Sequence, residues 1–167
     1  MPTILLCIIL LCSTNTFAEK GGLMKITTPA FGHNQPIPKK FTCQGEDINP
    51  GLKISDVPAG TKNLVLIVDD PDAPGGNWDH WIVYNIPVTD EIRENSIPGL
   101  EGHNDFGRLR WGGPCPPSGT HRYFFKLFAL DAVLNFSKTP RKADVIKAMQ
   151  GHVLAQAELI GLYKKER

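Results

Sequence analysis

The chain has 167 residues, 41% of them hydrophobic and 21% charged, and a formal net charge of +1. This length suits one domain with a core of its own, and the composition is that of an ordinary globular protein. A charge so close to zero gives no global attraction to nucleic acid or to an anionic membrane. Any preference for anions must therefore come from local groups.

The first eighteen residues predict a signal peptide. Residues 4–12 form an apolar run that is shorter than the roughly 20 residues needed to span a bilayer. Thr16 and Ala18 place small residues where a signal peptidase binds, so we expect cleavage after Ala18. No Lys or Arg precedes the run, and a frayed apolar N-terminus is the alternative. The prediction leaves one domain, residues 19–167, acting in the periplasm or outside the cell.

Short strand-like segments separated by 16 Gly and 14 Pro predict an all-β sandwich or barrel. The expected strands are residues 23–27, 52–54, 63–69, 81–86 and 123–130. Two of these segments, residues 63–69 and 81–86, are almost continuously apolar. Such runs are typical of strands buried on both faces.

Ionisable side chains continue the inward rows of three of these strands. Side chains alternate between faces, so His121 and Tyr123 share a face with Phe125 and the apolar residues beyond it. By the same rule Asp70 extends the row of residues 64, 66 and 68, and His80 extends the row of residues 82, 84 and 86. If the strand ends lie side by side, these groups meet in one small polar hollow.

The C-terminal stretch predicts a helix packed on the sandwich. Thr139 suits the N-cap and Pro140 the first helical position. Five residues then recur at helical spacing: Val145, Met149, Val153, Gln156 and Ile160. Gly151 and Gly161 indicate a break or an end within this stretch.

The segment from Asp70 to Pro74 holds two carboxylates in a loop that its prolines make stiff. A carboxylate beside a histidine orients the ring and raises its pKa, which keeps an imidazolium available to an anion. Asp70 and Asp72 with His80 and His121 therefore predict a small phosphate pocket. The alternative role for Asp70 is that of a turn-forming residue. The Ala73–Pro74 and Pro116–Pro117 bonds are candidates for cis geometry.

Other chemistry has weaker support in the sequence. Arg122 has the opposite parity to His121, so we expect it to form an ion pair at the rim. Asp and His also bind zinc or iron, but the spacing of a metal motif is missing, and we expect neither metal nor cofactor. Hydrolase motifs are missing as well, although Cys115 with a histidine could form a nucleophile pair. We therefore expect a binding protein and not an enzyme.

Cleavage of the signal peptide would leave two cysteines, Cys43 and Cys115, both in turn-rich segments. An oxidising compartment favours a disulfide if their Cα atoms come within about 7 Å. Two separate buried thiols are the alternative. A zinc site is not expected, because no CxxC or similar spacing is present.

Several of these segments resemble the phosphatidylethanolamine-binding protein family, also called Raf kinase inhibitor-like proteins, in its bacterial and archaeal branch. The matching segments are residues 41–47, 68–74, 80–81 and 112–123, within a similarity that runs from residue 24 to residue 163. The resemblance implies an antiparallel β-sandwich with Greek-key connections and peripheral helices, including a C-terminal one.

The resemblance also implies a pocket for the phosphate of a small molecule or of a phospholipid head group. It assigns pocket roles to Asp70, His80, His121 and Tyr123, and wall positions to Pro74 and Pro114. An exported regulator that inhibits or signals to a protein partner is the alternative function. The kinase partners of eukaryotic members are absent where an exported bacterial protein would act. A homodimer is left open.

Overall fold

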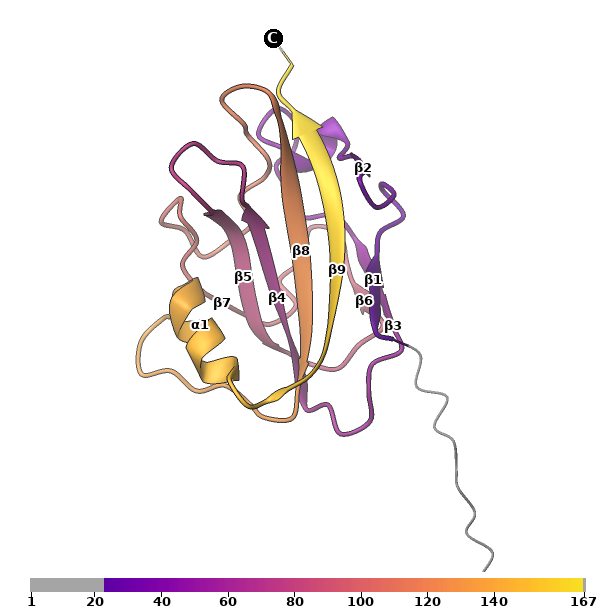
Figure 1. Cartoon of the computed structure of the whole chain (residues 1–167), viewed down its shortest axis with the longest axis vertical. Coiled ribbons are helices and arrows are strands. Elements are labelled where there is room, and N and C mark those ends of the chain that lie inside the picture. The colour runs from indigo at the N-terminus through magenta and orange to yellow at the C-terminus, as the bar shows by residue number, and fades with distance from the viewer. Residues whose placement is uncertain (1–22, 167) are drawn as a thin grey trace, which may run out of the picture.

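Two β-sheets pack face to face in the computed structural model, which describes residues 23–166 (Figure 1). The smaller sheet has the order β1 (Lys25–Thr27), β3 (Leu52–Ser55) and β6 (Glu91–Ile92). The larger sheet has the order β2 (Gln35–Pro36), β9 (Val153–Lys164), β8 (Thr120–Leu130), β4 (Asn63–Asp70), β5 (Trp78–Ile86) and β7 (Leu100–Glu101). A 3-10 helix, η1 (Lys39–Phe41), and one α-helix, α1 (Lys142–Met149), complete the described elements. The predicted signal peptide and its cleavage site lie outside the described residues.

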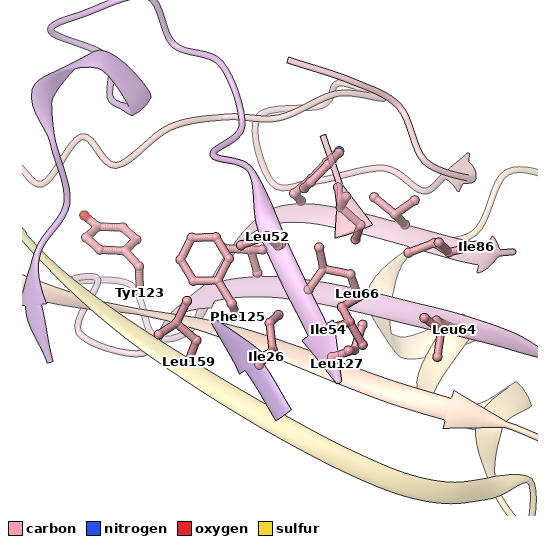
Figure 2. Close-up of a cluster of buried hydrophobic side chains, with 14 of the residues drawn as sticks. Ile26, Leu52, Ile54, Leu64, Leu66, Ile86, Tyr123, Phe125, Leu127 and Leu159 are labelled. Atoms are coloured by element: carbon pink, nitrogen blue, oxygen red, sulfur yellow. The ribbon is translucent and has the colours of Figure 1, made fainter. Parts of the chain in front are cut away.

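Strand β4 lies at the centre of the larger sheet and is buried along its whole length, as its apolar sequence predicted. On one face, Leu64 and Leu66 pack with Ile26 and Ile54 of the smaller sheet (Figure 2). On the other face its residues contribute to a second cluster that includes Val145 of α1. The predicted β-sandwich is therefore confirmed, with hydrophobic burial on both sides of one central strand.

The C-terminal prediction was right about the helix and wrong about its extent. Helix α1 begins after Arg141, whose backbone N–H donates to the Asp144 carboxylate at 2.9 Å, so Thr139 is not the N-cap. Among residues 23–166 no helix is long and apolar enough to cross a membrane. Gly151, with a φ of +79°, then turns the chain into β9.

Strand β9 was predicted as helix because several of its apolar residues fall at helical spacing. In the structure it pairs with β8 from one end to the other, from Thr120↔Lys164 to Leu130↔Val153. Its inward row ends in Leu159, Gly161 and Tyr163, which are all buried. Pairing with the long β8 strand outweighs the weak helical preference of the segment, because local propensities are small compared with tertiary contacts.

A buried carboxylate fastens α1 to the sheet. Asp69, at the end of β4, lies 2.8 Å from Lys126 Nζ of β8 and 3.0 Å from Lys142 Nζ of α1. The same Lys142 ammonium also pairs with Asp79 of β5. The Asp69 side chain is only 2% exposed, so its charge is compensated by two cations in a nearly dry setting.

Candidate functional site

Three strand ends meet at one end of the larger sheet. Strand β4 runs antiparallel to both β5 and β8, so its last residues lie beside the first residues of its neighbours. This arrangement brings Asp70, His80, His121 and Tyr123 to the wall of one hollow of about 200 Å³. The remaining wall comes from Ala73, Pro74, Trp78, Phe106, Cys115, Pro116 and Pro117. No Lys or Arg belongs to this lining.

Asp70 and His121 form a buried pair at the base of the hollow. His121 Nδ1 lies 2.7 Å from Asp70 Oδ2, and the two side chains are 8% and 4% exposed. The second carboxylate oxygen, Oδ1, accepts the Asp72 backbone N–H at 2.8 Å. Asp70 thus acts both as a turn former and as the group that orients the imidazole. With Nδ1 committed to Asp70, the ring has Nε2 left for a ligand.

His80 is held by a different kind of partner. Its Nδ1 lies 2.5 Å from the Gly112 carbonyl oxygen. A carbonyl can only accept, so Nδ1 carries a proton and Nε2 of the neutral ring has a lone pair. Burial lowers the pKa of His80, opposed by the Gly112 bond and by the charge of Asp70. The charge of Asp70 raises the pKa of His80 as predicted, but the net shift is downward because desolvation is the larger effect.

A β-bulge sets the direction of His80. Val68 pairs with Trp81, but the next residue, Asp69, pairs with Asp79, so β5 has one extra residue here. The His80 ring packs edge to face on Tyr123, whereas Ile82 and Tyr84 belong to the cluster on the opposite face of the sheet. The predicted parity of His80 with residues 82 and 84 is wrong, because a bulge breaks the alternation of side chains.

Four rings form one wall of the hollow from its base to its mouth. Neighbouring ring centroids are 5.1 Å apart for Tyr123 and His80, 5.3 Å for His80 and Phe106, and 5.5 Å for Phe106 and Trp78. Each contact is edge to face, with interplanar angles of 86°, 74° and 76°. Tyr123 is 1% exposed and Trp78 is 37% exposed, so the wall leads from the core to solvent.

The Tyr123 hydroxyl is buried and makes no hydrogen bond of ordinary geometry among the described residues, although the Asp70 carboxylate lies near it. Burial, followed by the nearby Asp70 charge, raises the pKa of Tyr123, so the phenol keeps its proton. A buried hydroxyl without a partner costs free energy, and such groups in native proteins call for an explanation. A ligand oxygen in the hollow would satisfy this donor.

Two predicted pocket residues lie outside the lining. Asp72 accepts the backbone N–H and the guanidinium of Arg122, with a closest side-chain distance of 2.7 Å. This pairing with Arg122 lowers the pKa of Asp72 to about 2. Pro114 is buried, and its carbonyl accepts the Cys43 N–H at 3.2 Å. The predicted rim ion pair of Arg122 is present, and it occupies the carboxylate that was assigned to the pocket.

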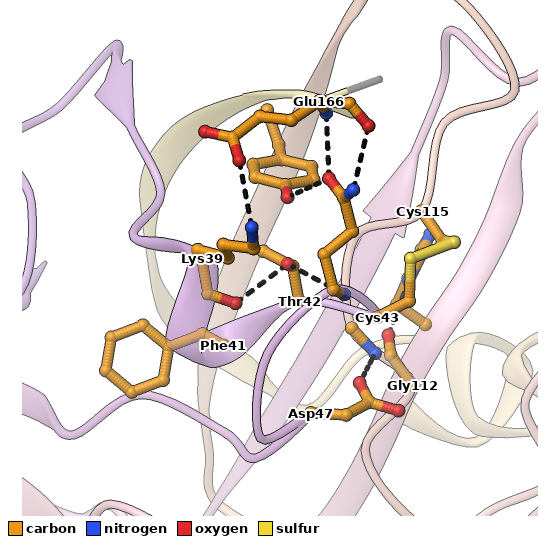
Figure 3. Close-up of a disulfide and its surroundings, with 12 residues drawn as sticks. Lys39, Phe41, Thr42, Cys43, Asp47, Gly112, Cys115 and Glu166 are labelled. Carbon is orange, nitrogen blue, oxygen red and sulfur yellow. Dashed lines mark hydrogen bonds and ion pairs between the residues drawn. A yellow bond between two sulfur atoms is a disulfide. The ribbon is translucent and has the colours of Figure 1, made fainter.

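Cys43 and Cys115 form a disulfide, with an S–S distance of 2.04 Å and a Cα–Cα distance of 5.4 Å (Figure 3). The two cysteines are therefore bonded in the structure and are not two separate buried thiols. Cys115 and the two prolines after it line the hollow, so the bridge fixes one side of the pocket. No peptide bond among residues 23–166 is cis, and both predicted cis bonds are wrong. Gly76, with a φ of +102°, turns the loop after β4 instead.

Sequence reasoning did not assign Trp78, Phe106, Pro116 or Pro117 to the pocket. The prolines were visible in the segment around Cys115, but Phe106 lies in a loop whose position depends on tertiary contacts. Among the described residues, no group of three or more His, Cys, Asp or Glu side chains could hold a metal ion.

The fold and the pocket define a class of proteins: β-sandwiches with a small histidine- and aspartate-lined hollow at a sheet end. The model of the family described as "Phosphatidylethanolamine-binding protein" matches residues 27–164 of this chain. The chain belongs to this family, as its sequence motifs indicated.

Relatives in other organisms support the assignment. A UPF0098 protein of Methanothermobacter thermautotrophicus is 47% identical over 150 residues, which covers 85% of this chain and 99% of the relative. A UPF0098 protein of Aquifex aeolicus is 46% identical over an alignment that covers 94% of this chain and 98% of the relative.

Two solved structures have the same fold. A phosphatidylethanolamine-binding protein homolog of Chlamydia trachomatis has a TM-score of 0.83 at 45% identity, covering 86% of this chain and 99% of that one. YbcL of E. coli is described as a member of the mammalian family. It has a TM-score of 0.80 at 29% identity, and the match covers 87% of this chain and 100% of YbcL.

Proposed function

We propose that this protein is a non-enzymatic binding protein whose hollow takes a phosphate group, carried by a small molecule or by a phospholipid head group. The observation that carries the proposal is the buried Asp70–His121 pair beside the unpartnered Tyr123 hydroxyl. Together these groups leave an imidazole nitrogen and a phenol proton for one ligand. Family membership supports a role in binding.

The hydrogen-bonding groups of the hollow favour a singly charged phosphate. Tyr123 donates a proton, and His121 donates from Nε2 when it is protonated. The neutral His80 ring accepts at Nε2, so the ligand has to supply a proton there. A phosphomonoester monoanion has both P–O⁻ and P–OH groups and matches this pattern. A dianion would face the Asp70 carboxylate without a lysine or arginine in the lining to balance it.

The same lining argues against hydrolysis. The one thiol considered as a nucleophile, Cys115, is bound in the disulfide. The described lining contains no Ser or Thr side chain beside the two imidazoles. Without a nucleophile next to a base, the pair of Asp70 and His121 can orient and hold an anion but has no covalent step to assist.

Calorimetric titration with phosphoethanolamine and with inorganic phosphate tests the binding function. We expect both to bind the wild-type protein, and the double variant His80→Ala/His121→Ala to lose binding. The matched control is His152→Ala, which removes an exposed imidazole 2.8 Å from Asp131 at the other end of β8. Equal affinities of the wild-type protein and the double variant would contradict the assignment of this hollow as the phosphate site.

The proposed place of action is the periplasm or the outside of the cell. The signal-like residues 1–18 and the exposed position of Cys43 in a disulfide support export, because disulfides persist in oxidising compartments. Cell fractionation of the native host and the N-terminal sequence of the mature protein test this proposal. A mature chain that still begins at Met1 in the cytoplasm would contradict it.

A further inference from the structure

A second cavity, of about 580 Å³, shares no lining residue with the phosphate pocket. The two are neighbours through the segment from Trp111 to Gly113. Trp111 lines the second cavity, Gly112 accepts from His80 in the first, and Gly113 donates to Asp47 in the second.

We propose that this second cavity binds a small organic cation, an amine or a guanidinium group carried on an apolar body. The proposal does not depend on phosphate binding in the other pocket. It stands on two carboxylates that only neutral groups hold in place, and on two indole rings fixed beside them.

The two carboxylates are positioned but not neutralised. Glu101 Oε1 accepts the indole N–H of Trp81 at 2.7 Å. Asp47 Oδ1 accepts the backbone N–H of Gly113 at 2.7 Å, and Figure 3 shows Asp47 close to the disulfide. Neither has a Lys, Arg or His within ion-pair distance in the described part of the chain. Each carboxylate therefore keeps a second oxygen for a ligand.

Partial burial of a carboxylate without an opposite charge nearby costs free energy. Glu101 is half-buried in β7, and burial raises its pKa, with the Trp81 bond opposing this effect. Elsewhere in the fold, the carboxylates of Asp69 and Asp72 are paired with cationic side chains. Arg110 also lines the cavity but makes no ion pair with Glu101, so a ligand cation placed against Glu101 would supply the charge partner that this carboxylate lacks.

The indoles provide a preformed apolar wall. Trp81 and Trp111 lie 5.7 Å apart between ring centroids, at an interplanar angle of 88°. Trp81 is fixed by its bond to Glu101, and the Trp111 indole N–H donates to the Phe41 carbonyl at 3.2 Å. Trp81 is 1% and Trp111 is 6% exposed, so the indoles offer a ligand a small apolar surface, and the charges of the carboxylates select a cation over a neutral molecule.

One positive side chain of the lining, Arg110, allows the direction of an affinity change to be tested. Arg110 lines the cavity and is exposed, and it has no ion pair within the described residues. Because its charge repels a bound cation, removing it should strengthen binding, whereas removing the charge of Glu101 should weaken it.

Calorimetric titration of the whole protein with benzylamine at pH 7, and with benzyl alcohol as its neutral counterpart, tests this site. We expect saturable binding of the amine and at least about tenfold weaker binding of the alcohol, which is one unit in log K. Glu101→Gln keeps an oxygen to accept from Trp81 and should weaken amine binding by about tenfold. Arg110→Ala should strengthen it.

The control variant is Asp131→Asn, which removes an exposed carboxylate remote from the cavity and should leave the amine affinity unchanged. Absence of saturable amine binding, equal binding of amine and alcohol, or an unchanged affinity in Glu101→Gln would each overturn the proposal. Phosphate affinity measured in the same variants should not change, so this site and the phosphate pocket are tested separately.

Discussion

His121 Nδ1 lies 2.7 Å from Asp70 Oδ2 in a setting where both side chains are almost fully buried. The chain contains a second Asp–His pair with nearly the same distance, Asp131 and His152 at 2.8 Å, and there both side chains are almost half exposed. The two pairs therefore have nearly the same hydrogen-bond distance and differ in how far they are buried. Only the buried pair faces a hollow with an unpartnered hydroxyl.

Phosphate affinity should fall as the pH rises. A phosphomonoester loses its second proton with a pKa of about 6, and the resulting dianion can no longer donate to the His80 lone pair. We expect the affinity for phosphoethanolamine to drop by at least about tenfold between pH 6 and pH 8, because the monoanion becomes scarce. Sulfate, which carries no proton in this range, is the matched ligand and should bind weakly throughout. A flat phosphate profile would mean that the charge state of the ligand does not matter.

Acid should destabilise the fold through His80. Because burial lowers its pKa in the folded state, the unfolded chain takes up a proton first, at its ordinary pKa of about 6.5. The free energy of unfolding is therefore unaffected by His80 above about pH 6.5. Below that pH it decreases, by at most about 1.4 kcal/mol for each pH unit. Urea unfolding at pH 7 and pH 5 should show a smaller decrease for His80→Gln than for the wild-type protein. Equal decreases would show that another group is responsible.

Strands β4 and β5 could be predicted because burial on both faces gives them long apolar runs, and β8 could be predicted from its alternating row of aromatic and apolar residues. The same logic failed at His80, since the bulge depends on how β5 pairs with β4 and not on the sequence of β5 alone. It failed again at β9, where pairing with β8 decides the structure of a segment with mixed local preferences. Both errors concern how a segment pairs with another strand, which its own residues do not specify.

Side-chain partners were equally hard to predict. The two carboxylates of the loop after β4 looked equivalent in the sequence, yet Asp70 turns inward to His121 while Asp72 turns to Arg122. The parity of β8 did indicate that Arg122 lies on the other face from His121. It did not indicate which carboxylate Arg122 would bind.

The pair of Asp72 and Arg122 should contribute to stability and not to phosphate binding. Asp72→Asn should lower the free energy of unfolding at pH 7 by about 0.5–1 kcal/mol, the upper range for a surface ion pair. Since the pairing lowers the pKa of Asp72 to about 2, its contribution is present above about pH 4 and is lost as the pH falls towards 2. A double-mutant cycle with Arg122→Ala measures the coupling, and a large loss of phosphate affinity in Asp72→Asn would contradict this role.

Removal of the disulfide should affect both stability and the pocket. The bridge joins residues 72 positions apart, and the chain-entropy model gives it about 4 kcal/mol. Cys43→Ser/Cys115→Ser should therefore unfold at a lower urea concentration, and it should bind phosphoethanolamine more weakly because Cys115, Pro116 and Pro117 line the pocket. Free thiols in unreduced, denatured protein would show that the bridge does not form.

The most direct test of the pocket is a crystal structure of the protein with phosphoethanolamine bound. We expect the phosphate oxygens within about 3 Å of His121 Nε2 and of the Tyr123 hydroxyl, which is hydrogen-bond distance, with the Asp70–His121 bond intact. A phosphate bound elsewhere while this hollow stays without ligand, or a phosphate in the hollow that contacts neither His121 nor Tyr123, would contradict the account.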